Sequence, residues 1–365
     1  MLVLSVAILL PLSVVAALPS QFEASCPKGC NCTPVKIECV DVHSKDPQEI
    51  FPHASPAIFK DLDTLTVTGN DFGDLRGRNL FDKGVKNPKV TLANFTNDGI
   101  TGFDEKTFEG LSGVEYLYLA NNNLTEVGKH PFRHMAKLKY LDLSNVFGRG
   151  VSAKVKADIL RDLFDANDDR FIELSGILLD DNGLEFLHPD TFCKVGGLSR
   201  LHLKNNKLTE FPIPKNGECF PSLKDLILEG NRFEVIPEEL YGDNIALTGF
   251  DVSRNPLKCG CEAQKFIKYA QRDDSDFMNQ DFTTCDSPIE FKNKRIFQMN
   301  PDDLCPSSGG HSFFFLLLTI IIVAIFAYRY ARVHNISLSV PQRIPFVAGY
   351  SVLKSNEDGT VPQFV

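Results

Sequence analysis

The 365-residue chain is 43% hydrophobic and carries a formal net charge of −9. The 37 residues after Tyr328 contain four basic and two acidic residues, which leaves −11 for the part before them, and this acidity argues against heparin or nucleic acid as the main partner. The eight histidines are scattered, and neither a metal-ligand helix pair nor a glycine-rich phosphate loop occurs, so we expect no enzyme, no metal and no bound cofactor.

An apolar stretch, residues 2–17, opens the chain and ends in Val15, Ala16 and Ala17. An apolar core followed by small residues is typical of a signal peptide, here residues 1–17 with cleavage near Ala17. No basic residue precedes the apolar core, so an uncleaved membrane anchor is the alternative. A signal peptide predicts export to an oxidising compartment, in which cysteines pair.

Leucine at a constant spacing dominates residues 62–257, which follow a cysteine-rich region, 18–61. Each copy reads LxxLxLxxNxL, the signature of a leucine-rich repeat. The two leucines that are two apart face inward from a short strand, and the residues between them face solvent. One repeat cannot bury its own leucines, so neighbouring repeats must stack. The clearest copies contain Leu117, Leu119, Asn122 and Leu124; Ile177, Leu179, Asn182 and Leu184; Leu201, Leu203, Asn206 and Leu208; and Leu226, Leu228, Asn231 and Phe233.

The predicted fold is an α/β repeat solenoid, a curved leucine-rich repeat horseshoe of about eight repeats. At each turn after a strand, we expect the asparagine amide to bind backbone groups that the turn leaves unpaired. By their first apolar position, the repeats start at Leu62, Asn87, Val114, Leu138, Leu174, Leu198, Leu223 and Leu247.

Two of these repeats depart from the period near 24 residues. In the repeat that starts at Asn87, we expect Val90 and Leu92 to hold the strand. Three extra residues then precede Ile100 and Phe103, where the pattern resumes. This repeat is therefore degraded but complete.

The second departure is the 36-residue interval after Leu138, which predicts an insertion, residues 146–173. Val146 stands where asparagine is expected, and residues 148–170 are polar and charged around one apolar group at helical spacing. We interpret the segment as a protruding loop with a helical turn or two, and a decayed repeat is the alternative. The apolar group comprises Ile159, Leu160, Leu163 and Phe164.

The outward residues of the strands form the expected ligand-binding surface. Stacking sets equal positions of neighbouring repeats about 5 Å apart, which brings three tyrosines together beside an acidic patch. Aromatic side chains exposed on a rigid sheet are typical interface anchors, although packing across the strands alone also explains them. The inserted loop is a second candidate surface. The expected binding residues are Tyr116, Tyr118, Tyr140, Asp142, Leu178, Asp180, His202 and Ile227, with Asp181 in the patch and Arg200 and Lys204 facing it.

Four cysteines lie before the first repeat and four after the last, in residues 258–306. A solenoid exposes its core at both ends, so we expect two disulfide-bonded caps, each with three conceivable pairings. A zinc site is the alternative, which export argues against. Cys193 and Cys219 lie 26 residues apart, about one repeat, and predict a bridge between neighbouring turns, with two free thiols as the alternative. The cap cysteines are Cys26, Cys30, Cys32 and Cys39, and Cys259, Cys261, Cys285 and Cys305.

A second apolar stretch, residues 313–328, contains no charge and precedes Arg329 and Arg332. It predicts a membrane helix, 312–331, after a juxtamembrane segment, 307–311, and the basic residues favour a cytoplasmic tail, 332–365. The chain continues beyond this stretch, which argues against a glycolipid anchor. We therefore expect a single-pass type I protein of the plasma membrane with an extracellular ectodomain.

Short motifs support this topology. Asn31, Asn94 and Asn123 each begin a glycosylation sequon in the expected ectodomain. In the tail, Tyr350 and Leu353 have the spacing of an adaptor-binding endocytosis signal. The apolar carboxyl terminus is a candidate ligand for a PDZ domain, which binds such ends by strand addition.

In layout, the chain resembles the trophoblast glycoprotein family, also called Wnt-activated inhibitory factors. The shared layout is a signal peptide, two cysteine caps around repeats with a hydrophilic insertion, one membrane helix and a short tail. The run from Cys285 to Cys305 is also similar, whereas the tail departs from the family's. The resemblance implies disulfides Cys259–Cys285 and Cys261–Cys305. It also implies a cell-surface protein that binds a secreted or cell-surface ligand and inhibits Wnt-type signalling. A cell–cell adhesion receptor and a pattern-recognition co-receptor are the alternatives.

Overall fold

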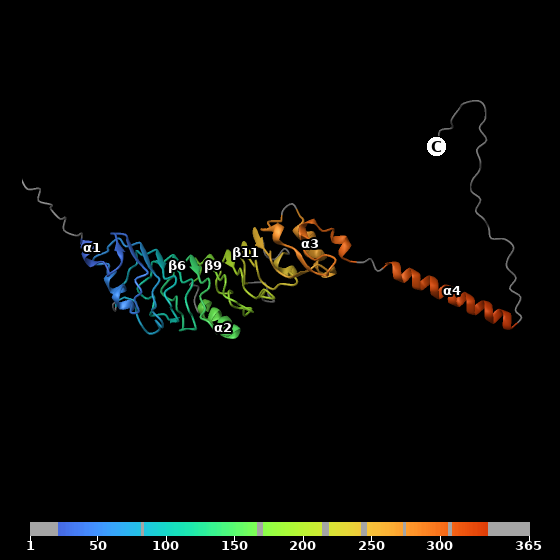
Figure 1. Ribbon diagram of the computed structural model, residues 1–365, viewed down its shortest axis with the longest axis horizontal. Coiled ribbons are helices and arrows are strands. Elements are labelled where there is room, and N and C mark those ends of the chain that lie inside the picture. Colours follow the sequence, from blue (N-terminus) through green and yellow to red (C-terminus); the bar gives the residue numbers. More distant parts are fainter. Residues whose placement is uncertain are drawn as a thin grey trace, which may run out of the picture. The chain divides into compact units, whose positions relative to one another are not determined.

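The computed structural model describes residues 21–81, 84–165, 171–213, 219–241, 247–272, 275–305 and 309–334 (Figure 1). The chain divides into two compact units at Cys305. The first unit contains the repeats and both cysteine caps, and the described part of the second is one long helix.

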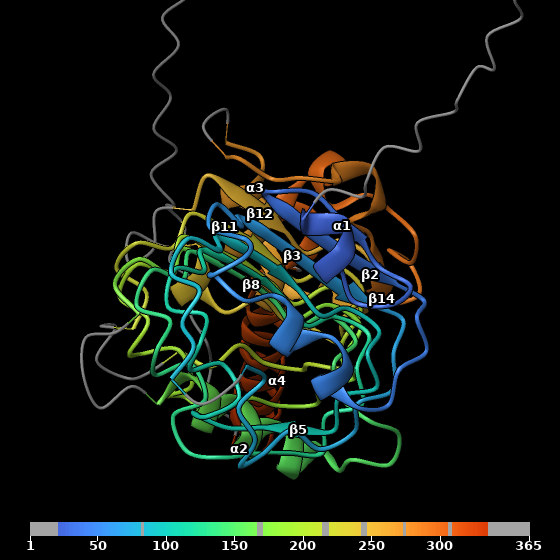
Figure 2. The same cartoon turned by 90° about the vertical axis from the view of Figure 1, so that its left-hand side faces the viewer.

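The first unit is built on one ten-stranded sheet along one side of the repeat array (Figures 1 and 2). Its strands are parallel except for the first pair, which is antiparallel. Each repeat contributes one short strand, as the leucine spacing predicts. In spatial order they are β1 (Asn31–Cys32), β2 (Lys36–Val40), β3 (Thr64–Thr68), β4 (Leu92–Asn94), β6 (Tyr116–Tyr118), β8 (Tyr140–Asp142), β9 (Gly176–Leu178), β10 (Arg200–His202), β11 (Asp225–Ile227) and β12 (Gly249–Asp251).

A continuous apolar core fills the space behind the sheet, from Ile37 to Leu304. The inward leucines are fully buried, for example Leu117 and Leu201. Phenylalanine rings line the opposite side of the core; those of Phe108 and Phe103 have centroids 5.3 Å apart. Burial of these repeated apolar rows stabilises the array only because neighbouring repeats stack. The stacked parallel strands and the continuous core confirm the predicted horseshoe solenoid.

The asparagines after the strands form the expected hydrogen-bond ladder. Asn206 is typical: its Nδ2 donates to the carbonyls of Leu179 and Leu203, both at 2.9 Å. Its Oδ1 accepts from the amides of Asn182 and Leu184 in the preceding repeat. Each turn is thereby tied to its neighbour through buried amides, which leaves few backbone groups unsatisfied.

The predicted register of the second repeat is wrong. β4 places Leu92 opposite Tyr116 and Ala93 opposite Leu117, so the repeat starts at Val90 rather than Asn87. Leu92 is half-buried on the outward face, and the fully buried Ala93 occupies the inward position. Alanine and phenylalanine fill inward positions that hold leucine elsewhere, and this hid the true register in the sequence.

The insertion also differs from its prediction. Helix α2 (Ala153–Phe164) has three turns and lies on the side of the array opposite the sheet (Figures 1 and 2). Its apolar face is buried rather than protruding, and Phe164 packs against Phe192 of the next repeat with centroids 5.4 Å apart. Lys156 Nζ donates to the carbonyl of Asn182 at 2.7 Å. Helix α2 of the insertion therefore packs onto the core rather than protruding as a free loop.

Disulfides close both ends of the array. The amino-terminal cap contains Cys26–Cys32 and Cys30–Cys39. The carboxy-terminal cap contains Cys259–Cys285 and Cys261–Cys305, the pairs that the resemblance implies. Cys193 and Cys219 bridge neighbouring turns.

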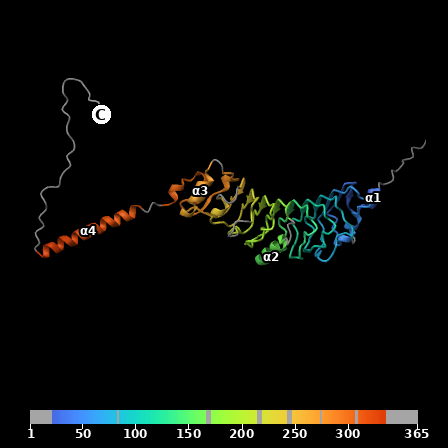
Figure 3. The ribbon, with the colours of Figure 1, turned by 180° about the vertical axis from the view of Figure 1, so that it is seen from behind.

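The remaining elements are short, apart from the last helix. They are α1 (Gln21–Ser25), α3 (Gln264–Ala270), β5 (Gly102–Phe103), β7 (Glu126–Val127), β13 (Leu257–Lys258), β14 (Cys285–Ser287), and the 3-10 turns Pro47–Glu49, Phe51–His53, Glu238–Leu240, Cys261–Ala263, Gln280–Phe282, Ile296–Gln298 and Pro301–Leu304. Figure 3 shows α3 in the carboxy-terminal cap, which follows β12, the last strand of the ten-stranded sheet.

Helix α4 (Gly309–Val333) belongs to the second unit. Within the described residues it is the one helix long and apolar enough to cross a membrane, over Phe315–Val333 with a mean hydropathy of 1.9. It begins three residues before the range expected from the sequence and ends two residues after it.

Candidate ligand-binding surface

The outward side chains of the central strands form two rows across the sheet. One row runs from Tyr116 through Tyr140 and Gly176 to Arg200 and Asp225, paired strand by strand. The second row runs from Tyr118 through Asp142, Leu178 and His202 to Ile227. Seven of the eight predicted binding residues lie in these rows, and Asp180 lies two residues beyond Leu178.

Three tyrosines form an aromatic cluster on β6 and β8. The Tyr140 ring lies 6.5 Å from that of Tyr116 and 5.7 Å from that of Tyr118. Tyr116 is 41% exposed, and the other two are half-buried. Such an arrangement presents a large, rigid apolar area that loses little side-chain entropy when a ligand binds.

A glycine on the next strand makes room for this cluster. Gly176 lies opposite Tyr140 in the register, and a Cβ built on Gly176 would stand 2.9 Å from a carbon of the Tyr140 ring. The absence of a side chain on β9 thus lets the ring lie across the strand. Gly176 is a positioning residue of the surface that sequence reasoning missed.

Carboxylates beside the tyrosines are partly withdrawn from water. Burial raises the pKa of Asp180 to about 6. A hydrogen bond from the Lys204 amide lowers this pKa, and the negative charges of Asp181 and Asp142 raise it further. Burial raises the pKa of Tyr140 to about 12, and nearby Asp142 adds to this effect. The Tyr140 hydroxyl therefore stays neutral at physiological pH and can donate or accept a hydrogen bond.

His202, in the same row, does not supply a positive charge at neutral pH. Burial lowers its pKa, and the neighbouring Arg200 lowers it further. The imidazole is therefore neutral where an unperturbed histidine would begin to charge.

The two basic residues expected to face the acidic patch form ion pairs with other carboxylates. Arg200 Nε lies 3.3 Å from Asp225 Oδ2, and Lys204 Nζ lies 2.8 Å from Glu229 Oε2. Glu229 is largely buried and also holds Arg254, at 3.1 Å. Arg200 and Lys204 are thus paired with carboxylates of the next repeat, which leaves the acidic patch of Asp142, Asp180 and Asp181 available. Counting positions across repeats could have revealed the Arg200–Asp225 pair.

Ile227 does not fit its predicted role as an exposed anchor. Its side chain occupies the outward row but is only 9% exposed. The usable apolar part of the surface therefore lies toward β6, β8 and β9 rather than β11.

The other predicted sites lie apart from this surface, with one exception. Asn31 and Asn123 are exposed, on β1 and in the turn after β6, whereas Asn94 is half-buried at the end of β4, on the sheet itself. Tyr350 and Leu353 lie outside the described residues.

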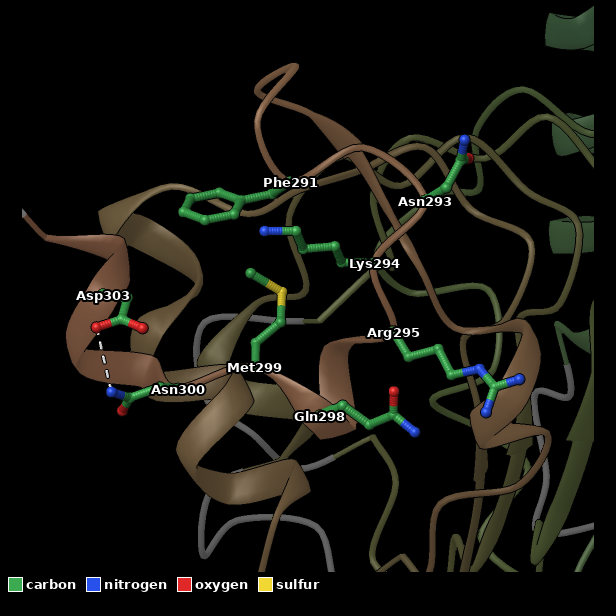
Figure 4. A pocket seen from close by; sticks show the side chains of 8 residues that line it. All are labelled: Phe291, Asn293, Lys294, Arg295, Gln298, Met299, Asn300 and Asp303. Carbon is green, nitrogen blue, oxygen red and sulfur yellow. Dashed lines mark hydrogen bonds between the residues drawn. The ribbon is translucent and has the colours of Figure 1, made fainter.

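A hollow of about 430 Å³ lies in the carboxy-terminal cap (Figure 4). Its side chains mostly engage one another: Lys294 Nζ lies 5.0 Å from the Phe291 ring centroid, and Asn300 donates to Asp303 at 3.2 Å. Arg295 pairs with Asp281 at 3.0 Å. Over the described ranges, no group of three histidine, cysteine or acidic side chains could hold a metal ion, in the hollow or elsewhere.

Comparison with known proteins agrees with this architecture. A leucine rich repeat family model matches residues 94–145 and 172–233. Mouse podocan is 26% identical over 251 residues, which cover 66% of this chain and 39% of podocan. Human lumican is 28% identical over 154 residues, which cover 40% of this chain and 41% of lumican. The chain thus spans less than half the length of these two relatives.

Among solved structures, human trophoblast glycoprotein (5T4, Wnt-activated inhibitory factor 1) has a similar fold, with a TM-score of 0.65 and 20% sequence identity. The match covers 77% of this chain and 98% of that structure. The chain thus contains leucine-rich repeats, and its fold resembles that of trophoblast glycoprotein.

Proposed function

We propose that this chain is a single-pass type I protein of the plasma membrane that binds a protein ligand on the outward face of its sheet and inhibits Wnt-type signalling. The aromatic cluster of Tyr116, Tyr118 and Tyr140 is the observation that carries the proposal. Buried tyrosines inside a repeat array would be packing residues, whereas these lie on the open face of the sheet. Tyrosine is enriched among residues that dominate binding energy.

The surface also indicates the chemistry of the ligand. Asp142, Asp180 and Asp181 lie beside the tyrosines, and the nearest basic side chains are paired with other carboxylates. A ligand that presents an apolar side chain next to lysine or arginine would complement both parts. Complementary charge mainly speeds association and selects the partner, and the aromatic contact supplies most of the affinity.

Three features support the cell-surface assignment. Five disulfides require an oxidising compartment, the sequons suit an exported domain, and α4 has the length and hydropathy of a membrane span. Wnt signalling is proposed because the structurally similar trophoblast glycoprotein is named a Wnt-activated inhibitory factor.

The test uses the full chain displayed on cells that carry a Wnt-responsive reporter. We would measure reporter output and the binding of tagged, secreted Wnt-pathway proteins. Replacing Tyr116, Tyr118 and Tyr140 with threonine keeps β-strand propensity and removes the rings. Binding should weaken roughly 30-fold or more, which corresponds to about 2 kcal/mol for an anchor cluster, and inhibition should be lost.

The matched control is Ile289→Thr, which also removes an exposed apolar side chain, 83% accessible, but in the carboxy-terminal cap. It should leave binding and reporter output unchanged at equal surface expression. If the triple variant still bound every ligand that the wild type binds, the outward face of the sheet would not be the site. If the wild type instead aggregated cells and left the reporter unaffected, the chain would be an adhesion receptor.

A further inference from the structure

The three sequons occupy different surroundings in the fold. Asn31 and Asn123 are exposed at the margins of the repeat array. Asn94 is the last residue of β4 and lies opposite Thr66 on one neighbouring strand and Tyr118 on the other. Because side chains alternate along a strand and Ala93 and Phe95 face the core, the Asn94 side chain emerges on the same face as the tyrosine cluster.

The local geometry presents the nitrogen that a glycan would occupy. Asn94 Oδ1 accepts a hydrogen bond from the Thr96 amide at 3.0 Å. Within the described residues, Asn94 Nδ2 makes no hydrogen bond, so no hydrogen bond of this atom would be lost when a sugar is attached. Thr96 supplies the hydroxyl residue of the sequon and faces outward on the same strand end.

The strands on the amino-terminal side of Asn94 offer space and no competing anchors. The outward residues of β3 are Thr64, Thr66 and Thr68, all short and half-buried. Short hydroxyl side chains make poor interface anchors, in contrast with the tyrosines on β6 and β8. A sugar could lie over these threonines, and its apolar face could stack on the ring of Tyr118 about 5 Å away.

We propose that Asn94 carries an N-linked glycan that packs against Tyr118 and forms the amino-terminal wall of the ligand-binding surface. The glycan covers β3 and β4 and leaves Tyr140, two strands or about 10 Å from Asn94, open to the ligand. The ligand footprint therefore extends from the tyrosines toward β9 and β10 and not toward the amino-terminal cap. The role of the glycan as a wall rests on the proposed function, whereas the presence of the glycan and its contact with Tyr118 do not.

The test needs no ligand and uses the full chain produced in mammalian cells. Mass spectrometry would measure glycan occupancy at Asn94, and hydroxyl-radical footprinting would measure oxidation of Tyr118 and Tyr140. Thr96→Ala abolishes the sequon, whereas Thr96→Ser retains it and is the matched control. Asn94 should be occupied in the wild type and in Thr96→Ser. In Thr96→Ala, Tyr118 oxidation should rise severalfold while Tyr140 oxidation stays constant.

Two further measurements keep the test decisive. Asn123→Gln removes an exposed sequon elsewhere and should leave both tyrosines unchanged. If Thr96→Ala did not reach the cell surface, enzymatic deglycosylation of the folded wild type should give the same rise at Tyr118. An unoccupied Asn94 in the wild type, or equal Tyr118 oxidation with and without the glycan, would overturn the proposal. Loss of ligand binding in the triple tyrosine variant, by contrast, bears only on the proposed function.

Discussion

Replacing Asp98 with asparagine should stabilise the folded chain at neutral pH and change it little in acid. Asp98 stands where six other repeats have the ladder asparagine, and it is fully buried. Its Oδ1 accepts from the amide and the Nδ2 of Asn70, at 3.0 and 2.9 Å. Its Oδ2 has no hydrogen-bond partner among the described residues. By the geometry of Asn122, whose Nδ2 donates to two carbonyls, an asparagine amide at this position would find partners.

The expected gain follows from the cost of ionising Asp98. Burial outweighs the hydrogen bonds from Asn70 and raises the pKa of Asp98 from 3.8 to about 7. Because the pKa of Asp98 is higher in the folded than in the unfolded chain, protonated Asp98 contributes to the stability of the native state. This contribution is fully present below pH 3.8 and is lost as pH rises through 7. At about 1.4 kcal/mol per pH unit between the two values, ionised Asp98 destabilises the native state by roughly 4 kcal/mol at pH 7.5. At pH 4 the difference falls to about 1 kcal/mol or less.

The assay is denaturant unfolding of the wild type and Asp98→Asn at pH 4 and at pH 7.5, followed by circular dichroism because the chain has no tryptophan. The midpoint should rise in the variant at pH 7.5 and nearly coincide with the wild type at pH 4. The exposed Asp190→Asn serves as the matched control and should leave both midpoints unchanged. A variant that is no more stable at pH 7.5, or a gain independent of pH, would refute the reasoning, because Asp98 would then be ionised and paired.

Three further predictions address the surface and the core. Gly176→Ala should push the Tyr140 ring aside and weaken ligand binding, whereas Gly196→Ala, where a Cβ meets nothing within 4 Å, should not; equilibrium binding to displayed chains decides this. Ligand binding through the acidic patch should weaken as pH falls from 7 to 5, since Asp180 protonates near 6, and Asp180→Asn should flatten this dependence in binding measured across that range. Leu160→Ala should destabilise the fold by about 3 kcal/mol in denaturant unfolding, because Leu160 of α2 is fully buried, and a loss below about 0.5 kcal/mol would show that the insertion is not part of the core.

The repeat starts show how much of the strand register can be predicted from the leucine positions in the sequence. Leucines at inward positions predicted seven of the eight repeat starts, because a large apolar residue every second position is costly to expose. The eighth was displaced by three residues, since Leu92 looked like an inward leucine while Ala93 and Phe95 took the inward places. Hydrogen bonding between strands chose the register, and this moved Asp98 into the ladder, where no sequence pattern had placed it.

The packing of the insertion and the ion pairs of Arg200 and Lys204 likewise could not be predicted from the sequence. Helical spacing of Leu160 and Phe164 was visible in the sequence, but whether the helix protrudes or packs depends on the cavity that neighbouring repeats leave. Likewise, Arg200 and Lys204 had acidic neighbours on both sides, and the strand geometry paired them with Asp225 and Glu229.

The sequence by itself determined the solenoid, its period, its caps and the outward rows, because these follow from local alternation and from the need of each repeat to stack. Only the tertiary structure decided which outward side chains cooperate. Tyr140 lies over Gly176, Ile227 is covered, and Asn94 shares a face with Tyr118, since each depends on side chains from strands some 24 to 36 residues apart in the chain. The repeat pattern builds the scaffold, and contacts between repeats make the site.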